Sequence, residues 1–268
     1  MKNSSGQQLR IRLRKKIIEY AFKSGSHYPH IGSCLSCIDI ILQTMIFEMS
    51  KNDRFILSKG HASLALYVIL NYLKKITDKE LSSYFQDGTN FGVHPPSTLP
   101  NHIPLATGSL GHGLSFAAGL AKGYKLLSVK QVSRVFCLIS DGECNEGAVW
   151  EAAMFASHNK LDNLVLLIDK NGYQATGRTK DVLGDGASGA KWKAFGFNTF
   201  QVDGHSLIDL DRTFKAIKKI SNHFPSVMIC KTVRGKGIPE IEDTLNSNYF
   251  HMSPDSYKKA LHDVELLK

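Results

Sequence analysis

The order of apolar and polar residues predicts an alternation of helices and short strands. The opening third of the chain reads as three helices, over 8–23, 35–49 and 62–75, with glycines near their ends as breakers. After a loop rich in Pro, His and Asn between Asn90 and Pro104, nearly continuous apolar runs alternate with helix-length amphipathic segments. The expected strands are FILS from Phe55, VFCLIS from Val135, NLVLLID from Asn163, FNTFQV from Phe197 and SVMICKTV from Ser226.

Apolar strands separated by helices indicate a parallel sheet, because parallel strands need crossover connections. We therefore expect an α/β fold of three layers, in which a parallel sheet carries helices on both faces. No repeat, low-complexity tract or linker divides residues 1–268, which favours a single domain. Ligands of such folds bind where the carboxyl ends of the strands open into loops, so the functional site should lie at that edge.

The composition is that of an ordinary globular protein, with 43% hydrophobic and 21% charged residues among 268. No run approaches the roughly 20 apolar residues of a membrane helix, and the N-terminal segment lacks the apolar stretch of a secretory signal. We expect a cytoplasmic protein with no membrane partner.

Five cysteines predict reduced thiols. The CxxC of Cys34 and Cys37 lacks further ligands at zinc-binding spacing, which favours buried thiols on a helix.

The formal charge of +9 would suit nucleic acid, sugar phosphates, an anionic cofactor or an acidic partner. Much of it lies in the cluster Arg10–Lys16, beside apolar residues spaced four apart at Leu9, Leu13, Ile17 and Ala21. This spacing indicates the solvated face of an amphipathic helix rather than a nucleic-acid patch. We therefore expect no nucleic-acid partner.

Polar turns follow two consecutive strands. The strand VFCLIS runs into Asp141 and Gly142, and the next strand is followed by Asn171. Parallel neighbours would bring the carboxylate and the carboxamide to the same edge of the sheet. With a main-chain carbonyl from the following turn, they form a half-shell of hard oxygens that suits Mg²⁺ and leaves positions for a diphosphate. Each turn alone is commonly structural, but the combination with the intervening strand, helix and strand indicates a site.

The metal-binding motif of thiamine-diphosphate enzymes resembles the segment SDGECNEGAVWEAAMFASHNKLDNLVLLIDKNGYQATGRT. The residues of this segment are similar to the transketolase version of the motif. The resemblance implies the thiamine-diphosphate-binding fold of a diphosphate domain. It also implies Mg²⁺, or Ca²⁺ or Mn²⁺ in its place, held by the side chains of Asp141 and Asn171 and by the carbonyl of Tyr173. Gly142 would lie at the cofactor.

The same resemblance extends to neighbouring positions. Glu146 matches a glutamate that couples the paired active sites of this family, and we expect it among the cofactor-binding residues. Ser140 stands in place of the usual first glycine of the motif. The segment TGSLGHGLSFAAGLAKG is a glycine-rich turn that opens into a helix, and such turns offer N–H groups to anions. It resembles a transketolase segment in which the backbones of Gly108 and Leu110 would line the diphosphate.

Four histidines match positions around the substrate in this family. DRFILSKGHASLALY contains an SxGHA motif, whose histidine, His61, would approach the cofactor phosphate and the substrate. HIGSCLSCIDI begins with His30, GVHPP contains His94, and the C-terminal loop KTVRGKGIPEIEDTLNSNYFHMSPD would contribute His251. Imidazoles can donate a hydrogen bond to a developing alkoxide and can exchange protons with sugar hydroxyls. We therefore expect these four histidines to be catalytic. Surface or packing roles are expected for His102, His158, His205 and His223.

The resemblance runs from roughly Leu9 to the end of the chain and implies one half of a transketolase. Such enzymes transfer a two-carbon ketol unit from a ketose or its phosphate to an aldose or its phosphate. A separate chain with the pyrimidine-binding and C-terminal domains would complete the enzyme, as a heterotetramer with two copies of each chain. The alternatives are the alpha subunit of a two-oxoacid dehydrogenase and a catalytically silent scaffold subunit. A nicotinamide-binding Rossmann domain is disfavoured, because no early strand leads into GxGxxG.

Overall fold

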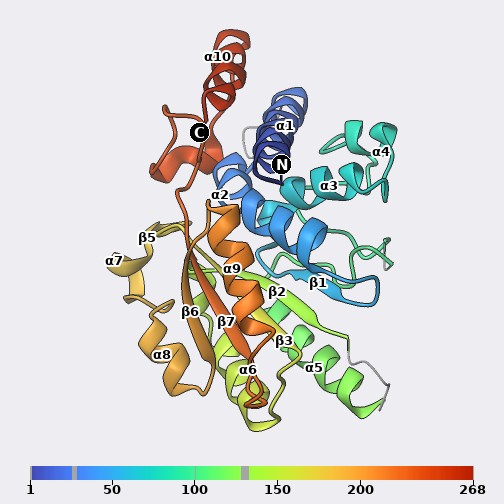
Figure 1. Ribbon diagram of the computed structural model, residues 1–268. Coiled ribbons are helices and arrows are strands. Elements are labelled where there is room, and N and C mark those ends of the chain that lie inside the picture. The colour runs from blue at the N-terminus through green and yellow to red at the C-terminus, as the bar shows by residue number, and fades with distance from the viewer. Residues whose placement is uncertain (1, 26–28, 100, 128–132, 268) are drawn as a thin grey trace.

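The computed structural model describes residues 2–25, 29–99, 101–127 and 133–267. A parallel sheet of five strands in the order β1-β2-β3-β7-β6 lies at its centre (Figure 1). Each strand begins and ends within two residues of the apolar run that predicted it, because a parallel strand buries both of its faces. The strands are β1 (Arg54–Leu57), β2 (Val135–Ser140), β3 (Leu164–Lys170), β6 (Asn198–Asp203) and β7 (Ser226–Lys231).

The three helices expected in the opening third are present as α1, α2 and α3. The second begins at Ile31, earlier than predicted, and continues as a π-helix, Gln43–Glu48. A separate antiparallel hairpin is formed by β4 (Tyr173–Gln174) and β5 (Gly177–Arg178). The α-helices are α1 (Lys2–Lys23), α2 (Ile31–Leu42), α3 (Ser63–Tyr72), α4 (Asp78–Ser82), α5 (His112–Leu126), α6 (Gly147–His158), α7 (Thr179–Leu183), α8 (Gly189–Ala194), α9 (Leu207–Ile217) and α10 (Pro254–Glu265).

Helices cover both faces of the sheet. Along β2, Phe136 and Leu138 face a core shared with α1, α2, α3, α9 and α10. The alternate residues, Cys137 and Ile139, face a second core built with α5, α6 and α8. Successive side chains of a strand point to opposite faces, and β1, β2, β3 and β7 each contribute to both cores. The expected three-layer α/β fold is confirmed.

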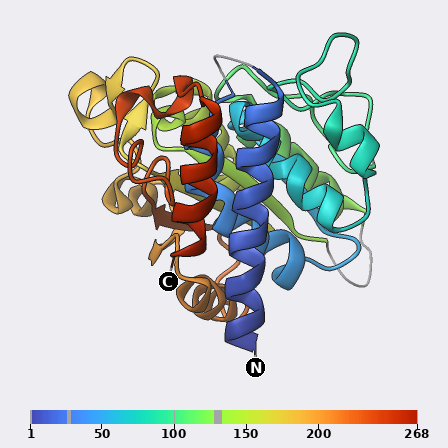
Figure 2. The same cartoon turned by 90° about the horizontal axis from the view of Figure 1, so that it is seen from above.

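The basic cluster Arg10–Lys16 is not simply a solvated face, and in this respect the prediction was wrong. The Arg14 side chain is fully buried, and its guanidinium donates to both carboxylate oxygens of Asp39 at 2.7 and 2.6 Å. Arg10 and His205 contact the same carboxylate at 3.0 and 2.9 Å. The reason is that α1 packs on α2 and also lies beside α10, so more than one of its faces is covered (Figure 2).

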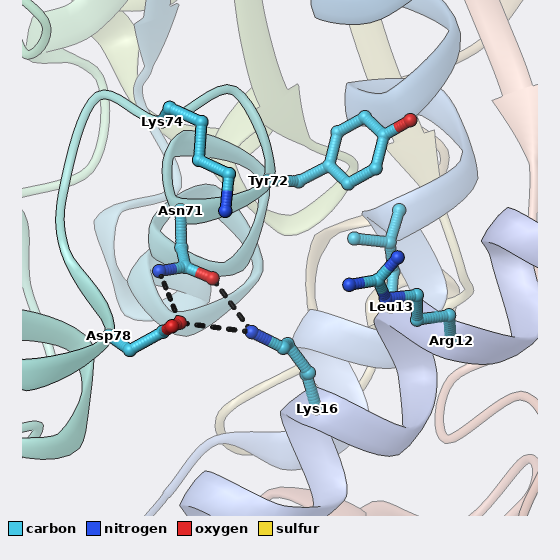
Figure 3. Close-up of a pocket in the computed structure, with 7 residues that line it drawn as sticks. All are labelled: Arg12, Leu13, Lys16, Asn71, Tyr72, Lys74 and Asp78. Atoms are coloured by element: carbon cyan, nitrogen blue, oxygen red, sulfur yellow. Dashed lines mark hydrogen bonds and ion pairs between the residues drawn. The ribbon is translucent and has the colours of Figure 1, made fainter.

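A small pocket of about 160 Å³ lies between α1 and the turn that joins α3 to α4 (Figure 3). Lys16 donates to the amide oxygen of Asn71 at 2.7 Å and lies 3.5 Å from the carboxylate of Asp78. The Asn71 amide donates to the same carboxylate at 3.0 Å. None of the residues that line this pocket comes from the loops at the carboxyl ends of the strands, so it is separate from the candidate site.

The segment Ile31–Glu48 is long and apolar enough to meet the criteria for a membrane span, with a mean hydropathy of 1.5. However, 83% of it is buried inside the protein, which is typical of a core helix. The five cysteines are buried free thiols, as the sequence indicated. Within the described part of the chain, no three His, Cys, Asp or Glu side chains gather as a metal site, so the CxxC of Cys34 and Cys37 belongs to the core.

Candidate functional site

The carboxyl ends of β2 and β3 bring Asp141 and Asn171 together. The two strands are adjacent and parallel, so the turns that follow them open at the same edge of the sheet. The Oδ2 atom of Asp141 accepts a hydrogen bond from the N–H of Gly172 at 2.9 Å. The Oδ1 atom of Asn171 accepts one from the N–H of Tyr173 at 3.0 Å. The juxtaposition expected from the sequence is therefore present.

Asp141 has one buried carboxylate oxygen without a partner. Its Oδ2 also accepts from the Thr179 hydroxyl at 3.1 Å, but its Oδ1 has no hydrogen bond within the described structure. Burial, and then the charge of Asp169, raise the pKa of Asp141 to about 6. A buried carboxylate with a free oxygen is costly unless a cation compensates it. Together with the neighbouring amide oxygen, this arrangement fits a divalent metal ion.

A buried ion pair lies next to this turn. Asp169, near the end of β3, and Lys59, in the loop after β1, are both fully buried and bonded to each other. Asp169 also accepts from the Ser36 hydroxyl at 2.6 Å, from the Asn171 amide at 3.1 Å and from the Thr232 hydroxyl. Burial alone would raise the pKa of Asp169, but Lys59 and the hydrogen bonds outweigh it and hold that pKa below its ordinary value. Asp169 is therefore charged at neutral pH.

A second buried carboxylate, Glu143, holds the glycine-rich turn in place. Its Oε1 accepts from the N–H of Gly111 at 2.8 Å and from the Ser58 hydroxyl, and its Oε2 accepts from the N–H of Ser140 at 3.3 Å. The Ser140 hydroxyl accepts in return from the N–H of Glu143 at 3.1 Å. Serine therefore fits this turn in place of glycine, and one carboxylate fixes three loops relative to one another.

Two glycines permit close approaches within the site. A Cβ atom at Gly142 would lie 2.7 Å from the Cβ atom of Gln174, so any larger residue would displace β4. A Cβ atom at Gly108 would lie 3.4 Å from the ring of His94, so the Gly108 backbone lies directly against this imidazole. Leu110 follows in the same turn and is half-buried. The structure thus places the glycine-rich turn beside a predicted catalytic histidine.

Three of the four predicted catalytic histidines converge. The rings of His61 and His94 lie 5.6 and 6.5 Å from that of His30. His30 precedes α2 with φ 47° and ψ 34°, a conformation that is strained for most residues, and its Nδ1 is buried without a partner in the described structure. Burial lowers the pKa of all three, that of His30 to about 4. They are therefore neutral imidazoles near pH 7.

His30→Asn should reduce the loss of stability in acid. The unfolded chain binds a proton at His30 near pH 6.5 and the folded chain only near pH 4, so this group makes stability fall as the pH decreases through that window. Through His30 alone, the free energy of unfolding should fall by on the order of 2 kcal/mol across this pH window. Asparagine tolerates the left-handed backbone of this position. Urea unfolding at pH 7 and pH 4.5 would measure the difference. His158→Asn, at an exposed histidine, should leave the pH dependence unchanged, and equal behaviour of both variants would contradict the prediction.

Arg234 is a site residue that the sequence motifs did not single out. It follows β7, the neighbour of β3, and is 2% exposed with a partnerless Nε within the described structure. Its guanidinium lies 5.4 Å from the centre of the Tyr173 ring. A buried guanidinium with a free donor suits a phosphate group. The signal available in the sequence was the cation of KTVRGKG, which directly follows a predicted strand.

The remaining predicted residues lie outside the histidine cluster. Glu146 is exposed at the start of α6, and Tyr173 is buried at the start of β4. His251 is exposed, and the ring of Tyr249 in the same segment lies 6.4 Å from that of His30. The roles assigned to Glu146 and His251 stay predictions.

Comparison with known proteins identifies relatives over almost the whole chain. The family model described as "Transketolase, thiamine diphosphate binding domain" matches residues 44–259. An apulose-4-phosphate transketolase subunit of Phocaeicola vulgatus is 33% identical, over 94% of this chain and 90% of that protein. The 6-deoxy-6-sulfo-D-fructose transketolase subunit SqwG of a Clostridium species is 30% identical, over 94% of both. Human transketolase is 36% identical over 87% of this chain but only 37% of its own length.

Solved structures show the same fold. The transketolase of Campylobacter jejuni superposes with a TM-score of 0.79 at 25% identity and covers 95% of this chain and 43% of its own. That of Leishmania mexicana gives 0.80 at 20% identity, a likeness of fold alone. The chain thus spans most of the two subunit proteins and less than half of the longer transketolases. It belongs to the transketolase family and carries the thiamine diphosphate binding domain of that family.

Proposed function

We propose that this chain is the diphosphate-binding subunit of a two-component transketolase. The observation that carries the proposal is the buried Oδ1 of Asp141, which has no hydrogen-bond partner among the described residues, next to the turn that carries Asn171. Carboxylate and amide oxygens suit Mg²⁺, which keeps positions for phosphate oxygens. The buried guanidinium of Arg234 provides positive charge for the same diphosphate.

In this proposal, Asp141, Asn171 and the carbonyl of Tyr173 hold Mg²⁺, or Ca²⁺ or Mn²⁺ in its place. The backbones of Gly108 and Leu110 line the diphosphate, because glycine-rich turns at helix starts offer N–H groups to anions. When bound, thiamine diphosphate supplies the electron sink for breaking and forming the carbon–carbon bond next to a ketose carbonyl. The protein contributes binding, orientation and proton transfer.

The histidines act on the sugar. Because His30, His61 and His94 are neutral near pH 7, each can accept a proton from a sugar hydroxyl or donate a hydrogen bond to a carbonyl oxygen as charge develops on it. The Nδ1 of His30 has no partner in the part of the chain that the structure describes, which leaves one ring nitrogen for such a contact. His251 is proposed as a fourth member. The substrates would be a ketose donor and an aldose acceptor, with or without phosphate.

A partner chain completes the proposed enzyme. Two relatives of similar length are named as transketolase subunits, and this chain covers 90% and 94% of them. We propose that a separate chain supplies the pyrimidine-binding and C-terminal domains, in a heterotetramer with two copies of each chain.

Mixing the two chains tests this function. With Mg²⁺ and thiamine diphosphate, the mixture should transfer a ketol unit from at least one member of a panel of ketoses and ketose phosphates, whereas each chain alone should not. Size-exclusion chromatography with light scattering would give the stoichiometry. A mixture that binds the cofactor in calorimetry but transfers no ketol unit from any member would favour the silent scaffold and contradict the proposal.

A further inference from the structure

Asp169 connects four segments at the carboxyl edge of the sheet. Its donors are Ser36 on α2, Lys59 after β1, Asn171 after β3 and Thr232 after β7. All five side chains are buried. Asp169 itself lies within the core rather than on the surface of the site, so it does not replace Asp141 as a metal ligand.

The contact with Asn171 determines how its carboxamide is turned. The Nδ2 atom donates to Oδ2 of Asp169 at 3.1 Å and lies 3.4 Å from the Ser36 hydroxyl. The Oδ1 atom is left for the opposite side, where it accepts from the N–H of Tyr173. A carboxamide has one ligating oxygen and one NH₂ group that cannot ligate a cation. Rotation by half a turn would therefore present the wrong atom to the metal.

We propose that Asp169, paired with Lys59, is a positioning residue that holds the amide oxygen of Asn171 toward the metal. This inference rests on the proposed function, because it concerns the same site. Lys59 allows a carboxylate to remain buried close to Asp141, since two uncompensated carboxylates would repel each other. Residues behind metal ligands commonly fix their orientation in this way.

A paired substitution removes the orienting group without leaving an unpaired buried charge. In Lys59→Met with Asp169→Val, both charges disappear together, which usually preserves the fold. In the complex with its complementary chain and thiamine diphosphate, this variant should bind Mn²⁺ about 10- to 100-fold more weakly than the parent, the effect typical of outer-shell partners. Electron paramagnetic resonance of free Mn²⁺ measures this without turnover, and urea unfolding checks the fold. If the variant does not fold, Asp169→Ala with Lys59→Met carries the same expectation.

Adding Asn171→Asp to the paired variant separates orientation from general damage. A carboxylate presents an oxygen whichever way it is turned, so the triple variant should regain most of the lost Mn²⁺ affinity. Thr232→Val is the matched control. It removes another hydrogen bond to Asp169 but keeps the contact with Asn171, so it should leave Mn²⁺ affinity unchanged.

Two results would overturn the inference: Mn²⁺ affinity in the paired variant equal to that of the parent, or a folded triple variant that stays as weak as the paired one. Loss of Mn²⁺ affinity in Thr232→Val as large as in the paired variant would also count against it. Failure of the proposed function is distinguishable, because it would show in the unmodified complex, either as no binding of Mn²⁺ with thiamine diphosphate or as binding without ketol transfer.

Discussion

Asp141→Asn should abolish metal-dependent cofactor binding while the fold is retained. The substitution keeps the size of the side chain but removes the charge that the metal compensates, so the affinity for Mg²⁺ with thiamine diphosphate should fall by more than about 100-fold. A ligand that binds only the folded state raises the unfolding temperature. Adding Mg²⁺ and thiamine diphosphate should therefore raise Tm of the parent complex and leave that of the Asp141→Asn complex unchanged.

Without the metal, the same variant should be as stable as the parent or more stable. Asp141 is 1% exposed and its Oδ1 has no hydrogen bond from any described residue, so a neutral amide avoids part of the cost of a buried charge. Function and stability would then change in opposite directions, as is common at functional sites. Asp211→Asn, at a half-buried residue of α9 that pairs with Lys215, is the control and should alter neither property. A ligand-induced rise in Tm of Asp141→Asn as large as that of the parent would contradict the assignment.

The strands and the meeting of Asp141 with Asn171 could be predicted from the sequence. Short, continuous apolar runs such as VFCLIS favour strands that are buried on both faces of a sheet. Consecutive strands that pair in parallel have the turns that follow them at the same edge of the sheet. The helix starts were less predictable. The chain enters α2 through His30 in a left-handed conformation, which is uncommon for residues other than glycine, so the pattern predicts a later start for this helix.

The buried charges could not be predicted, because the sequence does not show which charged residues meet. Lys59 and Asp169 are 110 residues apart in the chain, and no pattern in the sequence indicates that they pair. Glu143 lies within the motif that contains Asp141, but the residues of that motif do not indicate that this glutamate is buried. The basic neighbours of Arg14 suggest a solvated face, although its guanidinium faces α2. The periodicity of apolar residues does not reveal such buried charges, yet Lys59, Asp169 and Glu143 hold the loops that carry the site.

Asp39→Ala should lower the free energy of unfolding by about 3–5 kcal/mol, because it leaves the buried guanidinium of Arg14 without a carboxylate. Arg10 and His205 lose an acceptor at the same time. Since the total stability of a domain is about 5–15 kcal/mol, the urea midpoint should fall markedly. Asp211→Ala, at a half-buried position on the surface of α9, should change stability by no more than about 0.5 kcal/mol.

Arg14→Met with Asp39→Leu decides whether that loss comes from the unpaired charge or from packing. Removing both charges avoids the cost of burying either one alone, so this variant should be far more stable than Asp39→Ala and close to the parent. The pair joins α1 to α2, and α2 also provides the Ser36 hydroxyl that binds Asp169. Cofactor affinity should therefore follow stability, impaired in Asp39→Ala and nearly normal in the double variant. If the double variant were as unstable as the single one, packing around Asp39 rather than charge pairing would hold the two helices together.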